Sequence, residues 1–138
     1  MGERVIMSRE ILFKAKRKDN GEWVEGYYLP GMKLPGYDGK NDFIVMSDGD
    51  YFAINPITLC QYTGLTDKNG RKIWENDILK WRFKRVWKEE YHISKVVWDS
   101  FYSAFKVSVS GGFGKLREDI EYEVLDNIFD NADLLEVE

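Results

Sequence analysis

The residues best placed for acid–base chemistry are two carboxylates that lie close together in the sequence. Glu75 and Asp77 are two positions apart, so a strand would point both side chains to one face, where each could shift the pKa of the other. They could then act as an acid–base pair, provided that a cleft brings a substrate to them. The alternative is structural: segment 75–77 closes a turn, with Asp67 and Asn69 nearby, and side-chain oxygens accept hydrogen bonds from free backbone N–H groups. We favour the structural interpretation, since nothing in the sequence identifies a cleft or a substrate.

A nucleophilic or metal-dependent site has little support. His92 is the only histidine and Cys60 the only cysteine, which excludes a His-rich metal site and an intrachain disulfide. A Cys60–His92 pair would need an activating environment, whereas Cys60 stands between Leu59 and Gln61 in a segment whose pattern indicates a buried strand. We therefore predict an inert thiol, no catalytic residue, no metal site, no cofactor and no enzymatic activity. The alternative for an enzyme is a metal-dependent hydrolase that needs Asp77.

Three glycine-containing loops match ligand-binding motifs only in part. Segments 48–50 and 67–70 have the Asp and Gly residues of a calcium loop but lack its spacing and terminal Glu. Segment 110–115 resembles a phosphate-binding loop but lacks its first Gly and the Ser or Thr after the Lys. We predict that all three loops are turns.

Turn signals divide the chain into short extended segments. Asn20-Gly21 separates segment 9–17, which alternates with period two, from segment 22–29. This pattern predicts a tight hairpin in which both central residues take positive φ. Segment 47–50 and Asn69-Gly70 predict two further hairpin turns.

The predicted fold is mainly β. Eight or more short strands emerge from the turn spacing, and the chain is 15% aromatic, which favours strands over helices. We expect a small antiparallel β-barrel, or SH3-like barrel, built from hairpins, because closure removes exposed strand edges. Little helix is expected beyond a final turn at 132–135 capped by Asn131, and Asn76 is expected to tolerate the left-handed region.

Length and composition set the domain organisation. The chain has 138 residues, is 43% hydrophobic and carries a net charge of -4, which fits a folded domain rather than a disordered chain. We predict a disordered N-terminal end at residues 1–8 and a single compact domain at 9–138, with two hairpin lobes meeting near residue 56 as the alternative. No run of about 18 apolar residues and no secretory leader is present, so we expect a cytoplasmic protein without a membrane association.

One charged segment stands out as a candidate binding surface. Segment 80–88 contains five basic residues and no acidic one, and its alternation would place Trp81, Phe83 and Trp87 on the opposite face of a strand. The basic face could meet phosphates or an acidic partner. The alternative is pairing within the molecule, since segment 117–138 contains nine carboxylates. The candidate binding residues are Lys80, Arg82, Lys84, Arg85 and Lys88.

The longest motif resembles a known family. Segment 61–78, QYTGLTDKNGRKIWENDI, together with segments 9–16, 20–26 and 123–131, is similar to the YopX family of phage and prophage proteins. The chain departs from that pattern in turn residues, with Asn76 in place of the usual Gly. The resemblance implies a phage-encoded origin in a bacterial host, a β-rich fold similar to SH3-like barrels, and no assigned activity.

Two functions follow as hypotheses. The first is a phage or prophage accessory protein of unknown biochemical function that acts as a non-enzymatic binding module for a host or phage protein. The alternative is a nucleic-acid-binding barrel that uses segment 80–88, whose binding would weaken steeply with salt. A homo-oligomer is a further expectation, because edge strands and exposed aromatic side chains favour self-association.

Overall fold

The computed structural model describes residues 10–84, 91–109, 112–117 and 120–136. The N-terminal end predicted to be disordered, residues 1–8, lies outside these ranges. Within them the chain forms eleven strands, one short α-helix and two 3-10 turns. All strand pairs that form the two sheets are antiparallel, so the prediction of a mainly β protein built from hairpins is confirmed.

The first sheet has six strands in the order β4-β3-β2-β1-β5-β6. Its members are β1 (Phe13–Lys16), β2 (Trp23–Met32), β3 (Asn41–Val45), β4 (Tyr51–Ala53), β5 (Cys60–Thr66) and β6 (Lys72–Trp74), with the 3-10 turn η1 (Pro56–Thr58) before β5. Strand β2 approaches β3 closely at Gly26, where a Cβ atom would lie 2.2 Å from the carbonyl oxygen of Val45. Only glycine fits this position, because any side chain would collide with backbone.

The second sheet has five strands in the order β10-β9-β8-β7-β11. Its members are β7 (Asp77–Phe83), β8 (His92–Asp99), β9 (Ala104–Val109), β10 (Gly112–Lys115) and β11 (Ile120–Asn127). Along β11, buried Ile120, Tyr122 and Val124 alternate with half-buried Glu121 and Glu123. This period of two gives the sheet an apolar inner face and a charged outer face.

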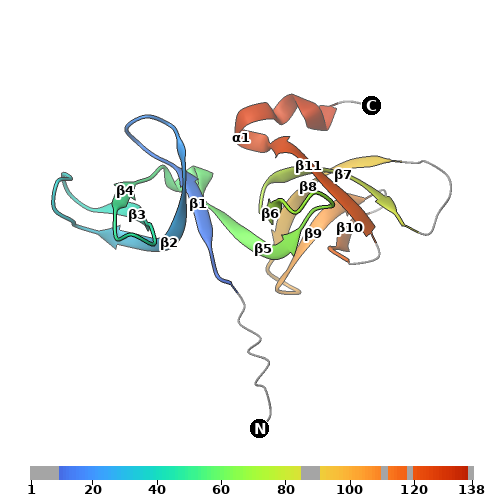
Figure 1. The fold of residues 1–138 in the computed structure, drawn as a ribbon, viewed down its shortest axis with the longest axis horizontal. Helices are drawn as coiled ribbons and strands as arrows, with labels where there is room; N and C mark the ends of the chain where they lie inside the picture. Colours follow the sequence, from blue (N-terminus) through green and yellow to red (C-terminus); the bar gives the residue numbers. More distant parts are fainter. Residues whose placement is uncertain (1–9, 85–90, 110–111, 118–119, 137–138) are drawn as a thin grey trace, which may run out of the picture.

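Figure 1 shows two lobes, an N-terminal lobe built from β1–β4 and a C-terminal lobe built from β6–β11, with β5 running from one to the other. In the described residues β4 and β6 end the first sheet and β10 and β11 end the second, so neither strand order forms a closed ring. Closure into a barrel is therefore not observed. An isolated bridge between Arg17 and Ile54 links the end of β1 to the end of β4. The division into domains near residue 56 stays a prediction.

Each lobe has its own apolar core, and a third cluster joins them. Ala15, Val24, Ile44 and Ile54 fill the N-terminal lobe. Leu79, Trp81, Val96, Val107, Ile120, Tyr122 and Val124 fill the C-terminal lobe together with Ile73 of β6. The joining cluster consists of Cys60, Tyr62 and Trp74, with Leu12, Trp23 and Phe129 packed against it. Because Leu12 lies just before β1, Trp23 in β2, Cys60, Tyr62 and Trp74 in β5 and β6, and Phe129 in α1, the lobes share apolar contacts.

The Asn-Gly hairpins form, but their turn type differs from the prediction. Gly21 has φ 72° and Gly70 has φ 80°, whereas neither Asn20 nor Asn69 has positive φ. The first loop is closed by Arg17 and Glu22, with the backbone N of Arg17 donating to the Glu22 carbonyl at 2.9 Å. Tight two-residue turns were the wrong prediction, because each Asn stays right-handed in a longer loop and only the Gly is left-handed. The expectation for Asn76 is confirmed, since its φ is 70°.

The helical segment follows β11. Helix α1 (Ile128–Asn131) continues into the 3-10 turn η2 (Ala132–Glu136). The cap is Asn127 and not the predicted Asn131: its side-chain oxygen accepts from the backbone N atoms of Phe129 and Asp130 at 2.9 and 3.0 Å. Since Asn127 is also the last residue of β11, the sheet and the helix join without a loop.

Candidate functional site

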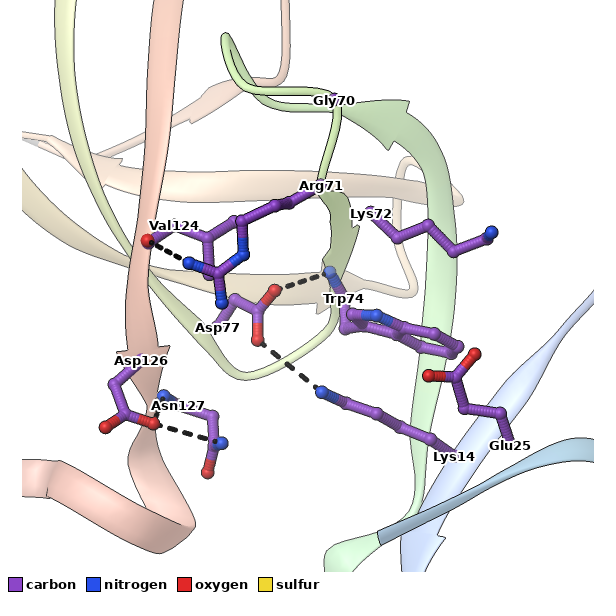
Figure 2. Close-up of a pocket in the computed structure, with 10 residues that line it drawn as sticks. All are labelled: Lys14, Glu25, Gly70, Arg71, Lys72, Trp74, Asp77, Val124, Asp126 and Asn127. Carbon is purple, nitrogen blue, oxygen red and sulfur yellow. Dashed lines mark hydrogen bonds and ion pairs between the residues drawn. The ribbon is translucent and has the colours of Figure 1, made fainter.

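A polar pocket lies where the two lobes meet (Figure 2). Its volume is about 430 Å³, which falls within the range of small-molecule sites. We call it the interlobe pocket, and its lining combines three basic and three acidic side chains. The lining residues are Lys14, Glu25, Gly70, Arg71, Lys72, Trp74, Asp77, Val124, Asp126 and Asn127.

The hairpin between β5 and β6 forms one wall, and Asp67 holds it in place. One carboxylate oxygen of Asp67 accepts from the backbone N atoms of Asn69 and Arg71, each at 2.9 Å, and the other accepts from Val124 N of β11 at 3.0 Å. Burial alone would raise the pKa of Asp67, but these three hydrogen bonds to its charged form outweigh burial and lower the pKa. A single buried carboxylate therefore fixes both the turn and its attachment to β11.

Asp77 begins β7 and is the most enclosed carboxylate of the pocket, with its side chain 3% exposed. One oxygen accepts from Trp74 N at 2.8 Å, and the other lies 4.0 Å from the Lys14 ammonium. Burial raises the pKa of Asp77 to about 6, although the Trp74 hydrogen bond and the positive charges of Lys14 and Arg71 act in the opposite direction. Its protonation therefore changes between mildly acidic and neutral pH.

Lys14 reaches the pocket from β1 and lies between two indole rings. Its ammonium is 4.7 Å from the ring centroid of Trp23 and 5.0 Å from that of Trp74. Both distances are within the range of a cation–π contact, which is stronger where water is excluded. Because Trp23 belongs to β2 and Trp74 to β6, this lysine connects the N-terminal lobe with the β5–β6 hairpin.

Arg71 approaches Asp77 from the side opposite to Lys14 (Figure 2). Its guanidinium donates one hydrogen bond, from Nη1 to the carbonyl oxygen of Val124 at 3.2 Å. In the described part of the chain it makes no ion pair with a carboxylate. A guanidinium has five N–H donors in a rigid planar arrangement, so Arg71 retains donors for a further acceptor.

Asp130 connects α1 to the N-terminal lobe. Its carboxylate accepts from the ammonium of Lys16, from Trp23 Nε1 at 2.8 Å and from Asn127 Nδ2 at 2.9 Å. Partial burial would raise the pKa of Asp130, but these hydrogen bonds outweigh it and lower the pKa to about 2. The ring centroids of Phe129 and Trp23 also lie 6.0 Å apart. The end of the described chain is thus tied to the first hairpin.

The predicted structural role of the 75–77 turn is confirmed in its hydrogen bonds. Glu75 Oε1 accepts from Gln61 N at 3.3 Å and Asp77 accepts from Trp74 N. Asn76, with its left-handed backbone, donates through its N–H to Val96 O at 2.9 Å and accepts from Ile128 N at 3.0 Å. Turn 75–76 therefore lies against both β8 and α1, which explains why a residue that tolerates positive φ is needed there.

Cys60 and His92 have separate environments. The Cys60 thiol is buried beside Thr58 O at 3.3 Å and Asn76 Nδ2 at 3.7 Å. Burial raises the pKa of Cys60 to about 11, so the thiol is not activated as a nucleophile. His92 is exposed and stacks on Trp81, with ring centroids 4.5 Å apart. The environment of Cys60 agrees with the expectation of an inert thiol.

The basic segment 80–88 is partly neutralised by its neighbour strand. Trp81 faces the core while Lys80 and Arg82 are half-buried on the outer face, as the alternation predicts. In the β7–β11 register Lys80 is opposite Glu123 and Arg82 opposite Glu121. The Arg82 Nε–Glu121 Oε2 distance is 3.1 Å. The basic and acidic segments, which are separate in the sequence, therefore lie side by side, with basic side chains opposite acidic ones.

The remaining candidate residues of this segment have different surroundings. Lys84 is exposed and lies beside Arg117 in a second polar pocket. Arg85 and Lys88 lie outside the described residues. Lys80 and Arg82 lie over the ring of Tyr91, at 4.3 and 5.7 Å.

Sequence reasoning missed a second exposed feature, the end of the β8–β9 hairpin. Phe101 is 84% exposed, Tyr102 60% and Trp98 44%. We call residues 98–105 the aromatic tip, which also contains Phe105. A signal was present, since two consecutive aromatic residues follow Asp99-Ser100 in a turn, where side chains have no core to enter.

The aromatic tip is held in one conformation by its polar residues. Asp99 Oδ1 accepts from the backbone N atoms of Phe101 and Tyr102 at 2.9 and 3.3 Å. Its other oxygen pairs with the Lys106 ammonium at 2.8 Å, and that ammonium lies 4.1 Å from the ring centroid of Tyr102. Ser103 takes a left-handed φ of 50° to complete the turn. Exposed aromatic side chains are thus presented by an ordered backbone.

The two-sheet fold and its hairpin motifs define a class of small β proteins. A family model described as YopX protein matches residues 12–136, and the chain belongs to this family. The chain is also similar to the crystal structure of protein EF1440 from Enterococcus faecalis, with a TM-score of 0.56 and 22% sequence identity over 93% of this chain and 99% of that chain. At this identity the similarity establishes the fold alone. None of the curated proteins matches the chain.

Proposed function

We propose that this YopX-family protein is a phage or prophage accessory protein that acts in the bacterial cytoplasm by binding another protein, and that it is not an enzyme. The observation that supports binding is the aromatic tip, where three large rings are exposed on an ordered turn. Exposed apolar side chains reduce solubility, so a contiguous group of them is typical of an interaction site. Tyr and Trp are also the residues that most often dominate interface energies.

The expected partner is a host or phage protein with an apolar depression that accepts Phe101 and Tyr102. Preorganisation by Asp99 lowers the entropy lost on binding, because its hydrogen bonds already fix the backbone of the turn that carries the rings. No helix in the described residues is long and apolar enough to cross a membrane.

The test compares a double variant with a matched control. Phe101→Ser combined with Tyr102→Ser should abolish recovery of a specific partner in a quantitative pull-down from infected or lysogenic cells. Tyr27→Ser, which removes an aromatic ring that is 66% exposed on the N-terminal lobe, should leave recovery unchanged. Equal recovery with both variants would contradict a role for the aromatic tip, and light scattering of the purified protein would test self-association.

Nucleic-acid binding is the second candidate, favoured by the cation–aromatic contacts of Lys80 and Arg82 with Tyr91. Bases can stack on exposed rings beside cations. The opposing observation is the pairing of Arg82 with Glu121, which reduces the net positive charge of this face. Salt titrations with short DNA and RNA distinguish the cases, since true binding weakens steeply with salt and is lost on Lys84→Glu with Arg85→Glu.

The finer fold assignment is also a proposal. An SH3-like barrel is supported in the C-terminal lobe because Ile73 and Leu65 of the β5–β6 hairpin pack on the inner face of the five-stranded sheet. An experimental structure with closed strand pairing around this core would establish it.

A further inference from the structure

We propose that the interlobe pocket binds a small oxyanion, a carboxylate or a phosphate-type group, between the guanidinium of Arg71 and the ammonium of Lys14. This site is independent of the aromatic tip. The two cations approach the same space from different elements, Arg71 from the β5–β6 hairpin and Lys14 from β1 (Figure 2). The pocket volume of about 430 Å³ leaves room for an organic body attached to the anion.

Arg71 supplies directional donors. Among the described residues Arg71 is engaged through Nη1 alone, with Val124 O at 3.2 Å, and this hydrogen bond orients the guanidinium. The remaining N–H groups can hold two oxygens of one carboxylate or phosphate, which is the geometry that arginine recognises best. The hydrogen bond to Val124 O thus orients the guanidinium and leaves its other N–H donors available.

Lys14 supplies a positive charge that is kept in place and forms only a long ion pair with Asp77. Its nearest carboxylate oxygen in the described residues is that of Asp77, at 4.0 Å. The two indole rings restrict the ammonium without removing its charge. A lysine held in this way is a better anion ligand than a solvated one, because less side-chain entropy is lost on binding.

The carboxylates around the site differ in how they would respond to an anion. Asp126 is hydrogen-bonded to Asn127 N at 2.8 Å and to Asn127 Nδ2 at 3.3 Å, while Glu25 is exposed at the rim with Lys72 near it. Asp77 lies between Arg71 and Lys14 and would repel an incoming anion while ionised. When protonated it becomes a hydrogen-bond donor to the same anion.

Binding should therefore be linked to uptake of one proton by Asp77. Its pKa of about 6 means that the protonated form is abundant at mildly acidic pH and scarce at basic pH. The groups that face it are Lys14 from β1, Arg71 from the hairpin and Asp126 from β11. Affinity is then expected to be about a hundredfold higher at about pH 5 than at about pH 8.

The experiment is an NMR titration of the full chain with acetate and, separately, with sulfate, at about pH 5 and about pH 8. The signals to follow are the Trp74 amide and the Arg71 side chain, with chloride at equal ionic strength as the reference. Saturable shifts at these groups with acetate support a carboxylate ligand, and shifts with sulfate support a phosphate-type ligand. No saturable shift with either anion would overturn the proposal.

Three variants make the test specific. Asp77→Asn keeps an acceptor for Trp74 N but is permanently neutral, so it should bind at about pH 8 as tightly as the wild type does at about pH 5, with no pH dependence. Arg71→Gln should abolish binding. Arg71→Lys keeps the positive charge and should bind in part, so it serves as the second variant if loss of the Val124 hydrogen bond in Arg71→Gln disturbs folding. Lys33→Gln, at an exposed residue outside the pocket, should bind as the wild type does. Binding by Asp77→Asn that keeps the wild-type pH dependence would overturn the linkage to this carboxylate.

Discussion

The interlobe pocket and the aromatic tip distribute polarity in opposite ways. Around the pocket, Asp67 and Asp77 are buried and each accepts hydrogen bonds from backbone N–H groups. At the tip, Phe101 and Tyr102 are exposed although each carries a large aromatic ring. Buried carboxylates here have hydrogen-bond partners that account for their burial, whereas the exposed rings contact only each other and the Lys106 ammonium within the described residues and leave most of their surface to solvent. The comparison separates buried carboxylates, whose surroundings control their effect on stability, from exposed rings, which are available to a partner protein.

The largest expected effect is at Asp67, whose removal should change the free energy of unfolding and no binding site. Asp67→Ala leaves the backbone N atoms of Asn69, Arg71 and Val124 without their acceptor. We expect the free energy of unfolding to fall by about 2–4 kcal/mol, since unsatisfied buried donors are costly. Urea denaturation measures it, with Asp38→Ala at an exposed position as the control. A loss no greater than that of the control would show that the hairpin does not depend on this carboxylate.

Asp77 sharpens the comparison because its burial opposes stability at neutral pH. A carboxyl whose folded pKa is raised to about 6 costs stability above that pH, and the cost disappears as pH falls below its unfolded value of about 4. Asp77→Asn should therefore raise the free energy of unfolding at about pH 8 by up to about 3 kcal/mol. Near pH 3.5 the variant and the wild type should be about equally stable. Denaturation curves at both pH values measure this, and a variant less stable at pH 8 would show that the Lys14–Asp77 attraction exceeds the desolvation of Asp77.

Asp130 connects α1 to the N-terminal lobe and should show the opposite pH dependence. Its pKa is lowered to about 2, so its contribution is present above about pH 4 and is lost as pH falls through about 2. Its side chain is 36% exposed, and solvent screening reduces the effect, so Asp130→Asn should cost about 1 kcal/mol at neutral pH. Thermal unfolding at about pH 7 and about pH 2 tests it. Equal losses at both pH values would assign the effect to packing and not to charge.

The smallest effect on stability is expected at the aromatic tip. Phe101→Ser with Tyr102→Ser removes two exposed rings, and we expect the free energy of unfolding to change by less than about 0.5 kcal/mol. Partner binding should nevertheless be lost. A large destabilisation in urea would show that these rings pack in the native state, and the contrast with the pocket would then fail.

Sequence reasoning succeeded where the information was local. Asn20-Gly21, Asn69-Gly70 and Asn76 each identified a turn because backbone conformation depends on neighbouring residues. The turn types were wrong because side chains accept hydrogen bonds from the backbone of the loop, as Asn20 Oδ1 does from Glu22 N at 2.9 Å, and these bonds favour a longer first loop. Mainly β structure followed from composition, whereas the separation into two open sheets did not.

The interlobe pocket could not be predicted because its residues are distant in the chain. Lys14, Asp77 and Asp126 come together only when β1, β7 and β11 have assembled. Pairing between the basic and acidic segments was one of two alternatives, and the β7–β11 register places Arg82 beside Glu121. The aromatic tip was readable from its two consecutive rings, but its ordered backbone depends on Lys106 in the next strand.

The position of β11 and α1 in chain order has a consequence for synthesis. Segment 120–130 supplies the partner strand of β7, the Val124 amide that Asp67 requires and the Asp130 carboxylate that holds the first hairpin. A nascent chain that has not reached these residues exposes the apolar face of β7 and β8 and lacks the contacts of Asp130 and Phe129 with Trp23 that hold the end of the chain to the first hairpin. Premature termination before residue 130 is therefore expected to yield a chain prone to aggregation.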